Sequence, residues 1–287
     1  FILMNLEGHD VKGILPETLT TEDKWIISGF NRVAKEITEN LEKFELGIAV
    51  QKIYDYLWDD FCDWYIEIAK IRMNGDDPVT AQNAREVLVW VMTGTLKLLH
   101  PFMPFITEEI WQTLPHEGEA LMISQWPEYD EALNFPQAEA EMKRLMDVIR
   151  GIRNRRSEMN VPPSRKAKVF IATEEQQTFV DGTAIVQRLA YANEVTVGSS
   201  FDMDGAVTIV TDDATVYIPM DELVAEIARL TKEMEAAKKQ LAQCTGKLNN
   251  QGFLSKAPAN VVEGVKADAE RLSDRIALIE TSLAALQ

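Results

Sequence analysis

The sequence predicts a mainly α-helical protein with a small α+β module and a projecting antiparallel coiled-coil arm. Hydrophobic residues recur at helical spacing over residues 1–160, and the period changes to strand-like alternation shortly afterwards. Two heptad repeats of equal length close the chain. We therefore predict a helical bundle at 1–160, an α+β connector module at 161–220 and an arm at 221–287.

The composition is that of a globular protein, since 46% of the 287 residues are hydrophobic and 26% are charged. No apolar run approaches the roughly 18 residues of a membrane span, and no basic segment precedes an apolar one as in a signal peptide. Two cysteines cannot form a disulfide framework or a Cys-only zinc site, so we expect a reduced, cytoplasmic setting. The chain begins at Phe1, which suggests a fragment.

The predicted bundle begins with Thr20 to Asp23, which resembles a capping box at a helix start. Asn74 to Pro78 is a clear break, and Pro101 and Pro104 stop or kink a later helix before a short one starting at Thr107. The first two buried stripes are predicted to contain Ile26, Ile27, Phe30, Val33, Ile37, Leu41 and Phe44, then Val50, Ile53, Tyr54, Leu57, Phe61, Trp64, Ile68 and Ile71. A last helix, 137–160, is predicted to bury Met142, Leu145, Met146, Ile149 and Ile152.

The connector and the arm have different periods. Strands are predicted at 168–171, 194–197, 206–210 and 215–218, with a helix at 178–192, and the last two strands form a hairpin. In the arm, Leu223 to Leu248 and Val262 to Leu286 carry apolar residues at alternating steps of three and four. Equal repeats on both sides of a break predict a hairpin whose first helix reaches about 39 Å.

The charge is unevenly distributed. The net charge is −17, yet residues 143–168 hold nine bases and two acids, and residues 236–262 contain no acid. An acidic body disfavours indiscriminate nucleic-acid binding, whereas local basic islands suit a selective reader of a polyanion. Two structural interpretations remain open: the arginines could pair with the helix C-terminus or with acids of the bundle, and the lysines could simply solvate a coiled coil.

No catalytic centre is legible in the sequence. The aromatic residues Trp58, Phe61, Trp64 and Tyr65 are interpreted as one buried face, with base stacking as the alternative. The carboxylates between residues 59 and 67 have helical spacing and are interpreted as surface ion-pair partners of Lys70 and Arg72. We predict no catalytic residues and no metal site, because no Ser/His/Asp, Cys/His or glycine-rich phosphate-binding pattern occurs.

Several motifs resemble one enzyme family. Residues 61–67 (Phe-Cys-Asp-Trp-Tyr-Ile-Glu) with Lys70 resemble the anticodon-binding domain of valyl-tRNA synthetases, and residues 100–111 resemble a motif shared with the isoleucine and leucine enzymes. Residues 149–166 are similar to the valine family's continuation, and residues 247–262 to its C-terminal coiled-coil arm. Isoleucine enzymes often end in a cysteine-rich zinc module, which two cysteines cannot form.

The resemblance implies a function. The parent would attach L-valine to tRNA(Val), using ATP and Mg²⁺ in a catalytic domain whose His-x-Gly-His and Lys-Met-Ser-Lys-Ser motifs are absent here. The editing domain is also absent, so we expect a C-terminal fragment that holds no cofactor, contacts no membrane, is monomeric and binds tRNA without catalysing its charging.

The resemblance and the charge pattern together suggest two contact surfaces. For the bundle, which would hold the anticodon, the candidates are Lys70, Arg72, Arg150, Arg153, Arg155 and Arg156. For the tip of the arm, which would reach the tRNA elbow, they are Lys238, Lys239, Lys247 and Lys256. Phe253 at the turn could stack on a base or fix the turn.

Two other classes of function remain. A non-catalytic protein-interaction scaffold would use the heptads to pair between chains instead of folding back. A helical enzyme built on Asp59, Asp63 and Glu67 would bind a metal in a carboxylate-lined cleft. The first predicts an oligomer and the second predicts metal binding.

Overall fold

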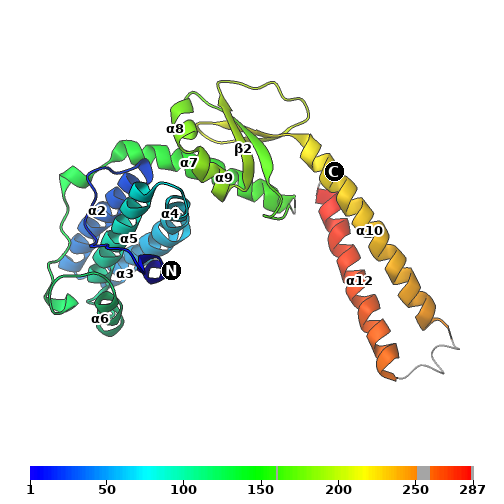
Figure 1. Cartoon of the computed structure of the whole chain (residues 1–287), viewed down its shortest axis with the longest axis horizontal. Helices are drawn as coiled ribbons and strands as arrows, with labels where there is room; N and C mark the ends of the chain where they lie inside the picture. The colour runs from blue at the N-terminus through cyan, green and yellow to red at the C-terminus, as the bar shows by residue number, and fades with distance from the viewer. Residues whose placement is uncertain (160, 251–258, 286–287) are drawn as a thin grey trace. The chain divides into compact units, whose positions relative to one another are not determined.

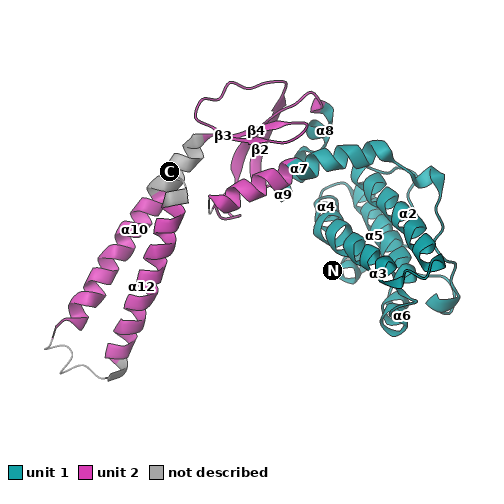
Figure 2. Cartoon of the chain, turned by 180° about the vertical axis from the view of Figure 1, so that it is seen from behind, with its two compact units in different colours: residues 1–147, 177–189 teal, residues 148–176, 190–287 magenta. Residues whose placement is uncertain are grey.

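The computed structural model describes residues 1–159, 161–250 and 259–285. The chain divides into two compact units, shown in different colours in Figure 2. Unit 1 contains residues 1–147 and 177–189, and unit 2 contains residues 148–176 and 190–287. One helix supplies residues to both units, so this division differs from the three predicted domains, which remain a prediction. Among the described residues, no helix is long and apolar enough to cross a membrane.

Unit 1 is a helical bundle, seen in blue to green in Figure 1. Its elements are α1 (Ile2–Leu6), α2 (Thr21–Glu42), α3 (Leu46–Asp55), the π-helical segment η1 (Tyr56–Tyr65), α4 (Ile66–Met73), α5 (Pro78–Leu99), α6 (Pro104–Thr113), the 3-10 turns η2 (Leu121–Ile123) and η3 (Glu131–Leu133), the first half of α7 (Pro136–Glu158), and α8 (Gln176–Asp181) and α9 (Thr183–Leu189).

Local chemistry sets the helix starts. The capping box is confirmed, because Asp23 N donates to Thr20 Oγ1 at 3.4 Å and Thr20 N donates to Asp23 Oδ2 at 3.2 Å. The predicted break before α5 is also confirmed, with the side chain of Asp77 capping a helix whose first residue is Pro78. The predicted start of α6 at Thr107 is wrong: the helix begins at Pro104, where a missing N–H costs nothing.

The first buried stripe is correct except at its end. Ile26, Ile27, Phe30 and Ile37 are buried as predicted. Phe44 is 87% exposed, because α2 ends at Glu42 and Phe44 takes a left-handed backbone conformation with φ of +60°. The helical period therefore does not extend to that residue.

The second buried stripe changes register where the winding becomes π-helical. Ile53, Tyr56 and Phe61 are buried, so the buried positions step by five residues across the start of η1. Trp58 consequently faces outward, is 55% exposed and stacks on Tyr54 at 6.3 Å between ring centroids. The predicted burial is confirmed for Phe61, Trp64 and Tyr65, and is wrong for Val50, Tyr54 and Trp58.

Unit 2 contains a four-stranded mixed sheet of β1 (Ala167–Ala172), β2 (Ala192–Gly198), β3 (Val207–Val210) and β4 (Thr215–Ile218). The order is β2-β1-β4-β3, with β1 parallel to β2 and the β3–β4 hairpin antiparallel, as predicted for the last two strands. The predicted helix at 178–192 is instead α8 and α9, which are separated at Gly182. A side chain there would collide with Leu145, 2.5 Å from an added Cβ.

Helix α7 has the predicted apolar face. Met142, Leu145, Met146, Ile149 and Ile152 are all buried. Within unit 2, Gly151 lets Ile209 of β3 approach the helix, since an added Cβ would lie 2.9 Å from its Cγ2. The sheet therefore packs directly against this part of α7.

The arm consists of α10 (Met220–Leu248) and α12 (Ala259–Ala285), which lie side by side in Figure 1 and confirm the predicted hairpin. Leu230 and Ala237 from α10 and Leu272, Ile276 and Ile279 from α12 are buried along the predicted repeats. Two ion pairs join the helices, Arg275 to Glu233 at 2.6 Å and Lys238 to Glu280 at 2.8 Å. The predicted repeat member Leu286 lies outside the described residues.

Gly94 provides a test of the packing in unit 1. The ring of Phe30 lies on this glycine, 2.4 Å from an added Cβ, so Gly94→Ala must displace an aromatic ring in the bundle. We expect a loss of about 1–3 kcal/mol in the free energy of unfolding. All six tryptophans lie in unit 1, so urea unfolding followed by tryptophan fluorescence measures this unit alone.

The matched control is Gly47→Ala in α3, where an added Cβ meets open space. We expect that variant to be neutral or slightly stabilising. Equal urea midpoints of unfolding for the two variants would contradict the packing of Phe30 on Gly94.

Candidate nucleic-acid interface

Arg72 of α4 is engaged inside unit 1. Its Nη1 lies 2.7 Å from Asp23 Oδ1, 3.1 Å from Thr20 Oγ1 and 3.5 Å from Glu22 Oε1. Asp23 is fully buried and also accepts a hydrogen bond from the hydroxyl of Tyr65 at 2.6 Å. The prediction that Arg72 pairs with the carboxylates at 59–67 is therefore wrong. Its position gives it a structural role, and we exclude it from the proposed contact surface.

The electrostatics of this cluster follow from burial. Burial raises the pKa of Glu22, and the neighbouring carboxylate of Asp23 raises it further. Burial and then Asp23 raise the pKa of Tyr65 well above its usual value. The hydroxyl therefore stays protonated and donates a hydrogen bond to Asp23. Burial alone would lower the pKa of Arg72, but the charge and hydrogen bond of Asp23, together with Tyr65 and Glu22, outweigh it and the pKa is raised. The guanidinium thus remains the positive partner of a buried carboxylate.

Lys70 lies one turn before the end of α4. Its Nζ forms the predicted ion pair with Glu67 and also lies 4.8 Å from the centre of the Phe1 ring. The side chain is only a quarter exposed. Its charge is partly satisfied within unit 1, which makes it a weaker candidate for a phosphate contact.

The four candidate arginines of α7 belong to unit 2 and differ in exposure. Arg150 and Arg155 are exposed, Arg153 is half-buried, and Arg155 pairs with Glu158 at 3.1 Å. Arg156 is only 6% exposed and donates to the carbonyl oxygens of Pro162, at 3.2 Å, and Arg165. Its guanidinium secures the turn that follows the helix, so a contact role for Arg156 is not supported. Lys70 and Arg72 lie in the other unit.

The arm presents lysines of two kinds. Lys238 is paired with Glu280, whereas Lys239 and Lys247 are exposed and have no ion-pair partner in the described part of the chain. Lys256, and Phe253 at the turn, lie outside the described residues. The structure therefore describes three of the four lysines of the predicted basic surface. Two of these three, Lys239 and Lys247, carry uncompensated charge.

Sequence reasoning missed Lys266. It is exposed in the first two turns of α12 and, among the described residues, has no ion-pair partner. Lys247 lies in the last turn of α10, so the two lysines stand at the ends that the connection joins. The acid-free stretch at 236–262 stops short of Lys266 because Glu263 follows it. Only the pairing of the two helices in the hairpin brings Lys266 to the tip. We call Lys239, Lys247 and Lys266 the tip lysines.

The alternative functional classes have specific structural requirements. Among residues 1–159, 161–250 and 259–285, no group of three or more His, Cys, Asp or Glu side chains is placed to hold a metal ion. The arm folds back on itself within one chain, which is not the arrangement that a heptad-mediated scaffold requires.

Comparison with known proteins identifies the class. The family described as the anticodon-binding domain of tRNA ligase matches residues 23–171, more than half of the chain, and the chain belongs to this family. A second family, described as the valyl tRNA synthetase tRNA binding arm, matches residues 222–287, the segment that forms α10 and α12. The resemblance to valyl-tRNA synthetases is thereby confirmed.

The similar curated proteins are valine–tRNA ligases. The chain is 43% identical to that of Clostridium acetobutylicum, with all of this chain aligned to 34% of the relative. It is 39% identical to that of Oceanobacillus iheyensis, over all of this chain and 33% of the relative. It is 43% identical to that of Carboxydothermus hydrogenoformans, over 91% of this chain and 30% of the relative. The chain thus spans about a third of the length of these relatives.

The structural role of Arg72 can be measured directly. Arg72→Met leaves the buried carboxylate of Asp23 without its cation, so we expect a loss of about 3–5 kcal/mol in the free energy of unfolding. Arg32→Met is the matched control in the same unit, because Arg32 pairs with Glu139 at a half-exposed site and should cost about 1 kcal/mol or less. Urea unfolding monitored by tryptophan fluorescence compares them, and an equally small loss in both would refute the structural role.

Proposed function

We propose that this chain is the tRNA-reading part of a valine–tRNA ligase. The bundle binds the anticodon region of tRNA(Val), and the tip of the arm binds the elbow of the same tRNA. The main support is that the segment matching the tRNA-binding-arm family forms the helical hairpin. The described part of its tip has three exposed lysines without ion pairs. The parent protein joins L-valine to tRNA, using ATP and Mg²⁺ bound by parts outside this chain.

The physical logic is that of a selective polyanion reader. A net charge of −17 repels a nucleic acid at long range, so binding depends on the few places where cations are accessible to its phosphates. Anticodon bases are unpaired and can be stacked or hydrogen-bonded by a protein surface. Arg150, Arg153 and Arg155 are the candidates retained on α7, in unit 2, and the tip lysines form the second contact. Two contacts on one rigid tRNA raise the effective concentration of the second binding event.

The setting follows from the same proposal. A monomer in the cytoplasm suits a tRNA reader, and the free thiols of Cys62 and Cys244 fit a reducing compartment. Recognition, rather than chemistry, is the part of the reaction assigned to these residues.

The tip lysines are the first test. Replacing Lys239, Lys247 and Lys266 by Ala should weaken binding of tRNA(Val) roughly tenfold or more at low salt, because three phosphate partners disappear. The slope of log affinity against log salt should fall by roughly one for each lysine that contacts a phosphate. Filter binding over a salt series measures both quantities, and circular dichroism checks that the arm remains helical.

Lys238→Ala is the matched control, since this lysine lies beside Lys239 but is already paired with Glu280. We expect little change in affinity or slope. If the triple variant bound tRNA with an unchanged salt slope, the tip would not be a phosphate contact.

The oligomeric state separates the proposal from the scaffold class. Glu233 and Lys238 of α10 pair with Arg275 and Glu280 of α12 in the same chain, so the heptads are satisfied internally. Light scattering should give a mass of 32.4 kDa at every concentration, with full helicity. A stable dimer whose dissociation reduces helicity would favour the scaffold.

A further inference from the structure

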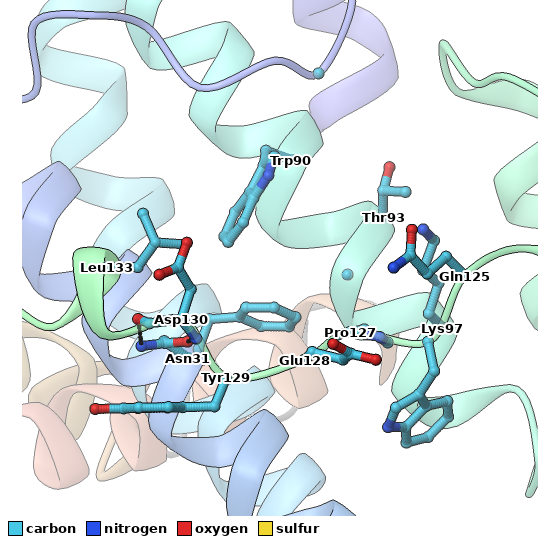
Figure 3. Close-up of a pocket in the computed structure, with 14 residues that line it drawn as sticks. Asn31, Trp90, Thr93, Lys97, Gln125, Pro127, Glu128, Tyr129, Asp130 and Leu133 are labelled. Carbon is cyan, nitrogen blue, oxygen red and sulfur yellow. Dashed lines mark hydrogen bonds between the residues drawn. The ribbon is translucent and has the colours of Figure 1, made fainter.

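Unit 1 contains a groove that neither the bundle packing nor the proposed tRNA contacts use. It lies between α2, α5 and the loop 125–130, encloses about 620 Å³ and is drawn in Figure 3. That volume is within the range of small-molecule sites. A second groove of about 580 Å³ shares Gly13, Thr93 and Lys97 with it and adds Lys12 and His116.

The groove is held open by hydrogen bonds between α2 and the loop. Asn31 Nδ2 donates to the carbonyl oxygen of Asp130 at 2.7 Å, and Asp130 N donates to Asn31 Oδ1 at 2.8 Å. Trp126 Nε1 donates to Thr38 Oγ1 at 2.9 Å. These bonds fix both ends of the loop to one helix, so the shape of the groove is set by the packing of the protein itself.

One face of α5 supplies the chemistry. Trp90, Thr93 and Lys97 recur at helical spacing on this face and all line the groove (Figure 3). The ring of Trp90 meets that of Phe30 edge to face at 5.2 Å between centroids, and Phe30 rests on Gly94. Trp126 and Tyr129 contribute further aromatic rings from the loop. A flat molecule would therefore meet aromatic walls.

Two polar groups in the groove have no partner among residues 1–159, 161–250 and 259–285. In the described part of the chain, the buried Thr93 Oγ1 makes no hydrogen bond. Lys97 is half-buried and, within the same described residues, no carboxylate lies within ion-pair distance of its ammonium group. Burial lowers the pKa of Lys97, as expected for a cation without a counter-ion. A hydroxyl and an ammonium one turn apart are suited to a carboxylate or a phosphodiester.

The acids near the groove limit the charge of the ligand. Glu128 and Asp130 also line it, and Asp130 Oδ1 is occupied by the backbone N–H of Ala132 at 2.9 Å. A polyphosphate would be repelled by these carboxylates, whereas a single negative charge can be placed on Lys97.

We propose that this groove binds a planar molecule carrying one negative charge, with its anionic end on Lys97 and Thr93 and its ring against Trp90 and Trp126. Two sources share this chemistry: a free aromatic acid, and an unpaired RNA base with its phosphodiester. The second source rests on the proposed function, and the first does not.

Matched probes distinguish the sources. Orotate and the dinucleotide UpU each combine a uracil ring with one negative charge, and uracil has the ring alone. Isothermal titration of the whole chain should show saturable binding of orotate or UpU at about 1 mM or tighter. Uracil should bind roughly tenfold more weakly or worse, since it cannot use Lys97. Binding of orotate identifies the free acid, and binding of UpU alone identifies the nucleotide.

Variants test the named groups. Lys97→Met should weaken binding of the charged probe by about tenfold to a hundredfold, and Thr93→Val should weaken it by a few-fold. Neither variant should change the binding of uracil. Lys97→Arg should retain most of the binding, and Lys43→Met, which removes an exposed lysine elsewhere in unit 1, should change nothing. Unchanged tryptophan-monitored unfolding of Lys97→Arg controls for folding.

Two results would overturn the proposal: no heat of binding for any probe at about 1 mM, or equal binding of charged and uncharged probes that is insensitive to Lys97. If tRNA binding were intact in either case, the proposed function would stand without the groove. If orotate bound and tRNA did not, the groove would stand without the proposed function.

Discussion

The bundle depends on one buried carboxylate. Asp23 closes the capping box of α2, accepts a hydrogen bond from the hydroxyl of Tyr65 in the π-helical segment and pairs with Arg72 of α4. Three elements are thereby fixed to one another through a group that has no access to water. A buried charge is tolerated only when its partners are complete, so the relative placement of these helices is tightly constrained.

This constraint decides which cations remain for binding. Arg72 neutralises Asp23, and Arg156 of α7 is used to hold the carbonyl oxygens of the following turn. Arg150, Arg153 and Arg155 of α7 remain at least partly exposed, and along the arm the tip lysines are exposed and have no ion pairs among the described residues. The candidate phosphate contacts are therefore few on a protein of net charge −17, which suits a reader that contacts a polyanion at few places.

Much of the fold was predictable from local patterns. Heptads, a capping box and alternating strands depend on neighbours within a few residues, and the arm, the start of α2 and the β3–β4 hairpin were predicted correctly. The outward position of Trp58 was not, because π-winding changes the period by one residue. The burial of Arg72 depends on Asp23, 49 residues away, and no local pattern reveals it. The groove between α2 and α5 has the same origin, since its polar groups are brought together only by packing.

We propose that these residues recognise valine tRNA selectively. Filter binding of the chain to tRNA(Val) and to a non-cognate tRNA of equal length, at matched salt concentrations, tests it most directly. We expect tighter binding of tRNA(Val), with a difference that persists as salt screens the shared backbone contacts. Equal affinities across the salt series, or no measurable binding of either tRNA, would contradict it.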